Sequence, residues 1–159
     1  MTLRSILIVG CGNMGGAMLS GWLAGGFDPA YFTIVDPALE RAPAGVRLMR
    51  ELPQGEAFDA ILLGVKPQML GDIAPALEAL VGPDALLLSI LAGAELDTLA
   101  EFFPRACGIV RIMPNLAAAL GKSPIALFAT GLGDDVRGAV DALMAPLGTA
   151  EWLDREEQM

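Results

Sequence analysis

Six residues near the start of the chain have the types and the spacing needed to hold a pyrophosphate. They are Gly10, Cys11, Gly12, Asn13, Met14 and Gly15, in the pattern G-x-G-x-x-G. The first glycine permits a tight turn, the second lets phosphate oxygens approach the backbone, and the third lets a helix pack closely on a strand. Free N–H groups and the positive end of the helix dipole then attract the anion. The alternative is a glycine-rich turn that binds no ligand.

An acidic residue follows at the distance expected for ribose recognition. Asp36 lies 21 residues after Gly15, and a carboxylate about 20 residues past the motif accepts hydrogen bonds from the adenosine ribose. Its charge repels a 2′-phosphate, so Asp36 favours NAD over NADP. Arg41 is a nearby cation able to pair with such a phosphate, which keeps NADP open. An Asp-Pro turn without a ligand is the other interpretation of Asp36.

Further candidate residues lie at or just after the ends of other predicted strands, where ligands bind to open α/β sheets. They are Val65, Lys66, Pro67, Ala92, Gly93 and Asn115. Lys66 suits a ribose or a nicotinamide, and Ala92-Gly93 allows close backbone approach. The alternatives are a solvated lysine and a simple turn. Asn115 suits a carboxamide or a water, or else it caps the following helix. Arg111, inside a strand, is expected to be structural.

The elements that must position these residues alternate between strands and helices. Strands are predicted at residues 5–9, 31–35, 46–49, 58–65, 85–91, 108–113, 125–129 and 149–153. Helices are predicted at residues 17–24, from 67 with a break near Gly71 because of Pro75, at 95–103, and from a cap at Asp134. This alternation predicts an α/β fold: a Rossmann-type, doubly wound, mostly parallel sheet of about eight strands with helices on both faces. Residues 1–159 form one dinucleotide-binding domain in this interpretation.

Composition narrows the classes of function. The 159 residues carry a net charge of -9, which argues against a basic nucleic-acid surface. The chain has no histidine, which excludes histidine-based triads and zinc sites, and its two cysteines are too few for a disulfide scaffold. Two reduced thiols indicate a cytoplasmic protein. Residues 5–27 are uncharged, but seven glycines interrupt them, so neither a membrane span nor a signal peptide is expected.

Four blocks of sequence resemble pyrroline-5-carboxylate reductases. They are Gly10–Gly15, Val65–Gln68, Ser89–Gly93 and Arg111–Asn115, which occur in that family in the same order and at similar spacing. The resemblance implies hydride transfer from NADPH or NADH to the ring imine of 1-pyrroline-5-carboxylate, which gives L-proline.

The resemblance also implies roles for individual residues. Residues 10–15 would hold the pyrophosphate, and Asp36 would lie at the adenosine ribose. Residues 65–67 and 92–93 would line the cofactor, with Asn115 toward the nicotinamide. Imine reduction needs a positioned hydride donor and a protonated imine. We therefore assign no catalytic residue and expect no metal.

The chain departs from this family in length. Family members continue past the region that matches residues 156–159 into a helical domain, which forms the homo-oligomer and supplies much of the substrate pocket. Its Gly-Ser-Gly-Pro motif does not occur here. We therefore expect an amino-terminal cofactor domain alone, which binds a dinucleotide but has little or no reductase activity.

Two other functions stay open at this point. The first is the amino-terminal domain of another dehydrogenase of the 6-phosphogluconate or β-hydroxyacid type, against which Val-Lys-Pro-Gln and Met-Pro-Asn discriminate. The second is a dinucleotide-sensing module without enzymatic activity, which the short length favours.

Overall fold

The central strands are short apolar runs that are buried on both faces. The computed structural model describes all residues from 1 to 159. Every position is buried in β1 (Ile6–Val9), β2 (Phe32–Val35), β4 (Ala60–Leu63) and β5 (Leu86–Ser89). Such strands are typical of parallel sheets that helices cover on both sides.

Eight strands form one sheet in the order β3-β2-β1-β4-β5-β6-β7-β8. The other four are β3 (Arg47–Met49), β6 (Gly108–Met113), β7 (Ser123–Phe128) and β8 (Gly148–Trp152). All neighbouring strands are parallel except β6 and β7. The direction in which strands are added reverses between β1 and β4. In open α/β sheets the carboxyl ends of the strands at such a switch point form the ligand-binding crevice.

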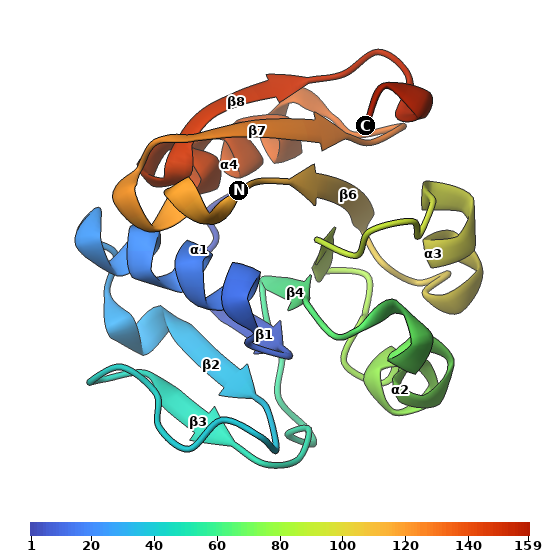
Figure 1. Ribbon diagram of the computed structural model, residues 1–159. Coiled ribbons are helices and arrows are strands. Elements are labelled where there is room, and N and C mark those ends of the chain that lie inside the picture. Colours follow the sequence, from blue (N-terminus) through green and yellow to red (C-terminus); the bar gives the residue numbers. More distant parts are fainter.

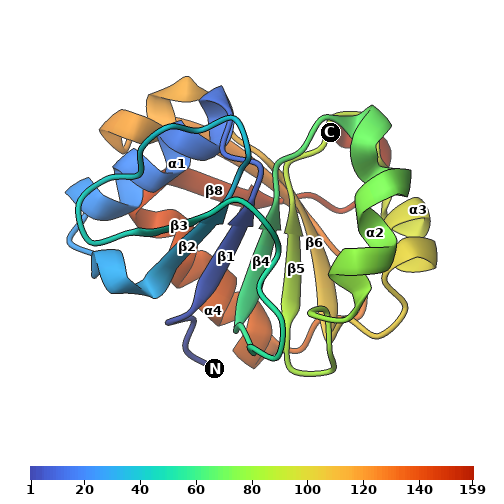
Figure 2. The same ribbon diagram turned by 90° about the horizontal axis from the view of Figure 1, so that it is seen from below.

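Four helices cover the two faces of the sheet, as Figures 1 and 2 show. They are α1 (Asn13–Ala24), α2 (Leu70–Glu78), α3 (Leu96–Phe102) and α4 (Asp134–Met144). Buried residues of α1 and α4 pack with Ile6 and Ile8, whereas those of α2 and α3 pack with Leu7 and Val9. Successive strand residues point to opposite faces, so each pair of helices covers its own face. None of the helices has both the length and the apolar character needed to cross a membrane.

Short 3₁₀ turns complete the connections. They are η1 (Pro29–Tyr31), η2 (Pro67–Met69), η3 (Leu116–Leu120), η4 (Ala145–Leu147) and η5 (Glu156–Gln158).

In the core under α1, Trp22 is fully buried and stacks on Phe32 with ring centroids 5.3 Å apart. Its indole N–H donates to the Leu143 carbonyl oxygen at 2.8 Å, which satisfies its one polar group and ties α1 to α4.

The predicted fold class is confirmed. All eight predicted strands are present, and each boundary lies within two residues of its predicted position. The sheet is mostly parallel and has helices on both faces. Apolar runs of strand length, separated by glycine and proline, carried this prediction.

Two helix starts differ from the prediction. α1 begins at Asn13 rather than at residue 17, and the N–H of Gly16 already donates to the Gly12 carbonyl oxygen at 2.8 Å. The glycine-rich sequence hides this first turn, because glycine is a poor helix former. The prediction that Asp134 caps α4 is wrong. Gly133 is the N-cap, and Asp134 lies in the first turn, where its negative charge interacts favourably with the positive end of the helix dipole.

α2 also differs, because it continues through Gly71 and Pro75 where the sequence predicts a break. Proline has no N–H and cannot bond to the carbonyl four residues earlier. Both residues are exposed, so the Gly71 carbonyl is accessible to water instead. Burial of Leu70, Ala74 and Leu77 on the other side of the helix then stabilises it.

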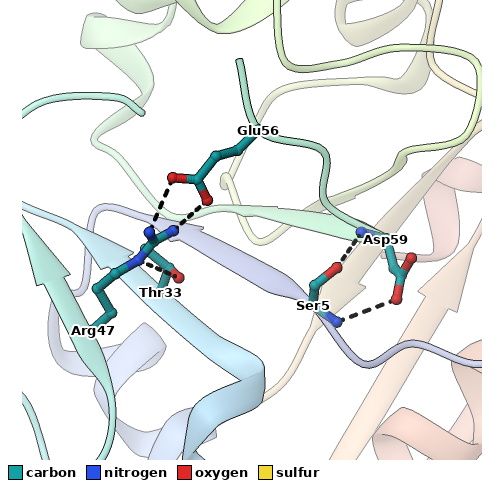
Figure 3. A network of polar contacts seen from close by, with 5 residues as sticks. All are labelled: Ser5, Thr33, Arg47, Glu56 and Asp59. Atoms are coloured by element: carbon teal, nitrogen blue, oxygen red, sulfur yellow. Dashed lines mark hydrogen bonds and ion pairs between the residues drawn. The ribbon is translucent and has the colours of Figure 1, made fainter. Parts of the chain in front are cut away.

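Polar contacts at the start of β1 and along β3 hold strands in register (Figure 3). The Asp59 carboxylate accepts from the Ser5 N–H at 3.2 Å, and the Ser5 hydroxyl accepts from the Asp59 N–H at 2.9 Å. On the edge strand β3, Arg47 donates to both carboxylate oxygens of Glu56, at 3.0 and 2.6 Å, and to the Thr33 hydroxyl at 3.2 Å. The hydrogen bonds between Arg47 and Glu56 lower the pKa of Glu56 and raise the pKa of Arg47.

The close packing of α1 on η3 predicts opposite effects for two helical glycines. A Cβ on buried Gly21 would collide with the Ala118 carbonyl oxygen and lie 2.6 Å from Leu147, so Gly21→Ala should destabilise the fold by about 1–3 kcal/mol. Gly138, on the exposed side of α4, has nothing within 4 Å of a Cβ. Gly138→Ala should stabilise by about 0.5–1 kcal/mol. Urea unfolding measures both, and equal stabilities of the two variants would contradict the α1–η3 contact.

Candidate functional site

The glycine loop crosses the ends of two neighbouring strands. β1 ends at Val9, and Gly10 turns the chain with φ +82°, a conformation that favours glycine. The Gly10 N–H donates to the Val35 carbonyl oxygen at 2.9 Å, and the Gly64 N–H donates to the Val9 carbonyl oxygen at 2.8 Å. A Cβ on Gly10 would lie 2.9 Å from the Val65 nitrogen. The loop is therefore fixed between the carboxyl ends of β2 and β4.

The other two glycines of the motif have different surroundings. Gly15 is buried, and a Cβ there would lie 3.3 Å from the Gly10 carbonyl oxygen, so its small size lets α1 pack against the turn. Gly12 is exposed, and a Cβ there would meet nothing within 4 Å. Packing explains Gly10 and Gly15, whereas the bare backbone at Gly12 faces open space.

The amino-terminal end of α1 is free to receive an anion. Gly12 is its N-cap, no side chain caps it, and its first turn holds no acidic residue. Helix ends leave N–H groups without partners inside the helix, and the dipole makes this end positive. The 12-residue helix thus presents uncapped donors beside the open space at Gly12.

Asp36 joins the end of β2 to the glycine loop. One carboxylate oxygen accepts from the Cys11 N–H and the other from the Ala38 N–H, both at 2.9 Å. Each oxygen retains a second lone pair, so the carboxylate is still able to accept from hydroxyl groups. Asp36 is half-buried and borders the same open space as Gly12.

A cleft of about 510 Å³ lies over this switch point. The predicted residues that line it are Gly10, Gly12, Asp36, Val65 and Lys66. Gly12 also lines a second hollow of about 430 Å³, together with Cys11, Asn13 and the exposed Arg41. Gly12 lines both hollows, and together they are lined by Arg41 and by seven of the residues predicted to bind the cofactor.

Sequence reasoning missed part of the lining of the cleft. Leu52, Met69 and Ile73 supply apolar side chains, from the segment after β3 and from η2 and α2. Arg50 donates to the Asp36 carbonyl oxygen at 3.1 Å and to the Leu39 carbonyl, so it holds the loop that follows β2. No motif marks these four residues. They reach the cleft only through the packing of elements distant in sequence.

The remaining predicted residues lie outside this cleft. Met14, in the first turn of α1, packs against the core, and Pro67 is exposed at the start of η2. Ala92 and Gly93 are exposed after β5, and Gly93 lines a separate hollow of about 320 Å³. Asn115, after β6, accepts from the Ala117 N–H at 2.9 Å and so caps η3. β1, β4, β5 and β6 are parallel neighbours, so their carboxyl ends, and the segments that follow them, lie along one edge of the sheet (Figure 2).

Arg111 and the two cysteines are further ionisable residues, of which Cys11 lies in the glycine loop. Arg111 is buried and forms an ion pair with Glu156 at 2.9 Å, in agreement with its predicted structural role. Cys11 and Cys107 are both free thiols. Burial, and then the neighbouring Asp36 charge, raise the pKa of the Cys11 thiol. No three His, Cys, Asp or Glu side chains are grouped so that they could hold a metal ion.

The raised pKa predicts slow alkylation of Cys11. In a Cys107→Ser background, the reaction with iodoacetamide should stay slow at neutral pH and have its midpoint above that of an unfolded control. Asp36→Asn should move the midpoint downward only part of the way, because burial is the larger cause. The pH–rate profile by mass spectrometry measures this, and rapid labelling of the folded protein at pH 7 would contradict it.

Comparisons with known proteins agree with this geometry. Residues 5–93 match the family described as NADP oxidoreductase, coenzyme F420-dependent. Pyrroline-5-carboxylate reductase of Haemophilus influenzae is 33% identical over 100% of this chain and 61% of its own length. That of Pseudomonas aeruginosa is 29% identical over 100% of this chain and 61% of its own length.

Solved structures show the same fold. A pyrroline-5-carboxylate reductase from Coxiella burnetii has a TM-score of 0.87 at 24% identity and covers 99% of this chain and 61% of its own. The Plasmodium falciparum enzyme, solved with NADP bound, has a TM-score of 0.83 at 18% identity, with 99% and 60% covered. The chain thus spans about three fifths of the proteins that it matches. The chain therefore belongs to the NADP oxidoreductase family described as coenzyme F420-dependent, and its resemblance to pyrroline-5-carboxylate reductases is confirmed along its whole length.

Proposed function

We propose that this chain is the cofactor domain of a pyrroline-5-carboxylate reductase and binds NAD(P)H across the β1–β4 switch point. The observation that carries the proposal is the exposed, bare backbone of Gly12 beside the uncapped end of α1. A pyrophosphate there would accept from the free N–H groups and gain from the helix dipole. The reaction that we propose is taken from the relatives that are named pyrroline-5-carboxylate reductase.

The adenosine half fits the 510 Å³ cleft. Asp36 would accept from the ribose hydroxyls, since both of its oxygens keep a lone pair. Leu52, Met69 and Ile73 provide the apolar contacts that an adenine ring needs. The negative charge of Asp36 favours NADH, whereas Arg41 in the adjoining hollow offers a partner for the 2′-phosphate of NADPH. We propose NADH as the preferred cofactor.

The nicotinamide half would extend along the sheet edge past Val65, Lys66 and Pro67 toward Ala92, Gly93 and Asn115. When bound, the dihydronicotinamide supplies the hydride that reduces the imine carbon of 1-pyrroline-5-carboxylate to give L-proline. These residues would orient the ring, and the exposed Ala92-Gly93 backbone allows a close approach. The Asn115 oxygen already caps η3, so its amide nitrogen is the atom we assign to the ligand side.

The rest of the substrate pocket is proposed to lie in the part of the relatives that this chain does not match. Residues 1–159 would then form the dinucleotide-binding domain, and the family's homo-oligomer would form through the additional helical domain. The chain alone should bind dinucleotide with little or no turnover. Its two free cysteines support a cytoplasmic location.

Gly12→Ala tests the pyrophosphate site. The new methyl group has no clash in the unliganded fold, and alanine is only a poorer N-cap residue than glycine, so the free energy of unfolding should fall by no more than about 1 kcal/mol. The methyl group would occupy the space that phosphate oxygens need, and we expect a Kd for NADH about tenfold higher or more. Calorimetric titration measures the Kd, with Gly138→Ala as the control. Unchanged NADH affinity in Gly12→Ala would refute the assignment.

Asp36→Asn tests the choice of cofactor. The amide keeps an oxygen for the Cys11 N–H but removes the charge that repels a 2′-phosphate. The ratio of NADH affinity to NADPH affinity should fall about tenfold or more. Arg41→Ala should raise that ratio, because it removes the candidate partner of the phosphate in the adjoining hollow. Thermal shifts and titrations with both cofactors measure the ratio. A ratio that neither substitution moves would show that these residues do not select the cofactor.

A further inference from the structure

The loop between β5 and α3 carries Ala92 and Gly93 but has few contacts of its own. Both residues are exposed, and Gly93 has φ +77°. At the start of the loop, the Ile90 N–H donates to Leu63 and the Leu91 N–H donates to the Ser89 hydroxyl, both at 3.2 Å. These two hydrogen bonds fix the start of the loop at residues 90 and 91, and they do not reach its end before α3.

A carboxylate from the end of the chain fixes that exit. One oxygen of Glu156, in η5, accepts from the Leu96 N–H at 2.7 Å and from the Arg111 guanidinium at 2.9 Å. Leu96 lies three residues after Gly93, at the first residue of α3. Arg111 pairs in the sheet with Ser89, the last residue of β5. Glu156 thus joins the two ends of the loop to each other.

Burial makes this connection strong. The Arg111 side chain is 8% exposed, and Glu156 is its only ion-pair partner. A buried guanidinium strongly favours keeping its carboxylate, because an unpaired charge loses its hydration without compensation. Charge-assisted hydrogen bonds are also stronger than neutral ones. The Leu96 N–H donates to the same carboxylate oxygen, so the residue that pairs with Arg111 also holds the backbone at the exit of the loop.

We propose that Glu156 is a positioning residue that sets the conformation of the Ala92-Gly93 loop for the nicotinamide half of a dinucleotide. This inference rests on the proposed function. Glu156 does not line the 510 Å³ cleft; it lines, with Gly93, the separate hollow of about 320 Å³. Its hydrogen bonds go to Arg111 and Leu96, and we assign its effect on the ligand to the loop that these two residues hold. The adenosine half, held by Gly12 and Asp36, should not depend on it.

The test compares a whole dinucleotide with its adenosine half. NADH and ADP are titrated into the chain and into Glu156→Ala, Glu156→Gln and Glu156→Asp. We expect the alanine and glutamine variants to bind NADH about tenfold more weakly and ADP within about twofold of the original chain. The aspartate variant, which keeps the charge, should recover part of the NADH affinity. Glu157→Ala is the matched control: this exposed neighbour lines the same 320 Å³ hollow, so the variant removes the same charge there, but Glu157 forms no ion pair and does not hold the loop.

A second measurement shows whether the loop itself has been released. Amide hydrogen exchange of residues 90–96 should be faster in Glu156→Gln, while exchange in α1 stays unchanged. This variant keeps the size of the side chain and loses the charge that pairs with Arg111, so it weakens the connection and is the one most suited to remain folded.

The outcomes separate this inference from the proposed function. Equal NADH affinity in Glu156→Ala, Glu156→Gln and Glu157→Ala would overturn the positioning role. An equal loss of NADH and ADP affinity would overturn it too, because the effect would then be general. If the original chain binds neither NADH nor ADP, the proposed function fails, and this inference fails with it.

Discussion

The close approach of two backbones, at Gly10 and Gly64, is the constraint on which the site depends. A Cβ on Gly64 would lie 2.6 Å from the Gly10 carbonyl oxygen, and one on Gly10 would lie 2.9 Å from the Val65 nitrogen. Neither position has room for a side chain. The contact holds the turn after β1 tightly over β4, so that α1 starts directly above the switch point. Everything proposed for the ligand follows from that placement.

The glycines of the motif differ in what explains them. The fold requires glycine at Gly10, which has a positive φ and where a Cβ would lie 2.9 Å from the Val65 nitrogen, and it favours glycine at Gly15, where a Cβ would lie 3.3 Å from the Gly10 carbonyl oxygen. Gly12 is not, since a side chain at that position would project into open space. A position where glycine is unnecessary for packing, at an uncapped helix end, is evidence of a binding role rather than a structural one. Asp36 also fixes the backbone between Gly10 and Gly12, because its carboxylate accepts a hydrogen bond from the Cys11 N–H.

Much of the fold could be predicted from the sequence, because buried parallel strands are short apolar runs between glycine and proline. The start of α1 could not, since its first turn contains glycines that sequence rules assign to a loop. The continuation of α2 through Pro75 depends on which side of the helix faces water. For the site, the motif indicated Gly12 and Asp36. The apolar lining, such as Ile73, depends on tertiary packing that no local pattern encodes.

The contact between α1 and η3 restricts the length of a ligand that can bind along the edge of the sheet. α1 carries Gly12 at its start, and Gly21 lets the same helix rest directly on the backbone of η3, which begins at the cap formed by Asn115. The Asn115 N–H is itself anchored to the buried Ser123 hydroxyl at 2.9 Å. The two positions are thus connected through rigid, packed elements rather than through loops. The distance between Gly12 and Asn115 is therefore set by the packing of α1 on η3, and a ligand that contacts both residues must have a length that matches this distance.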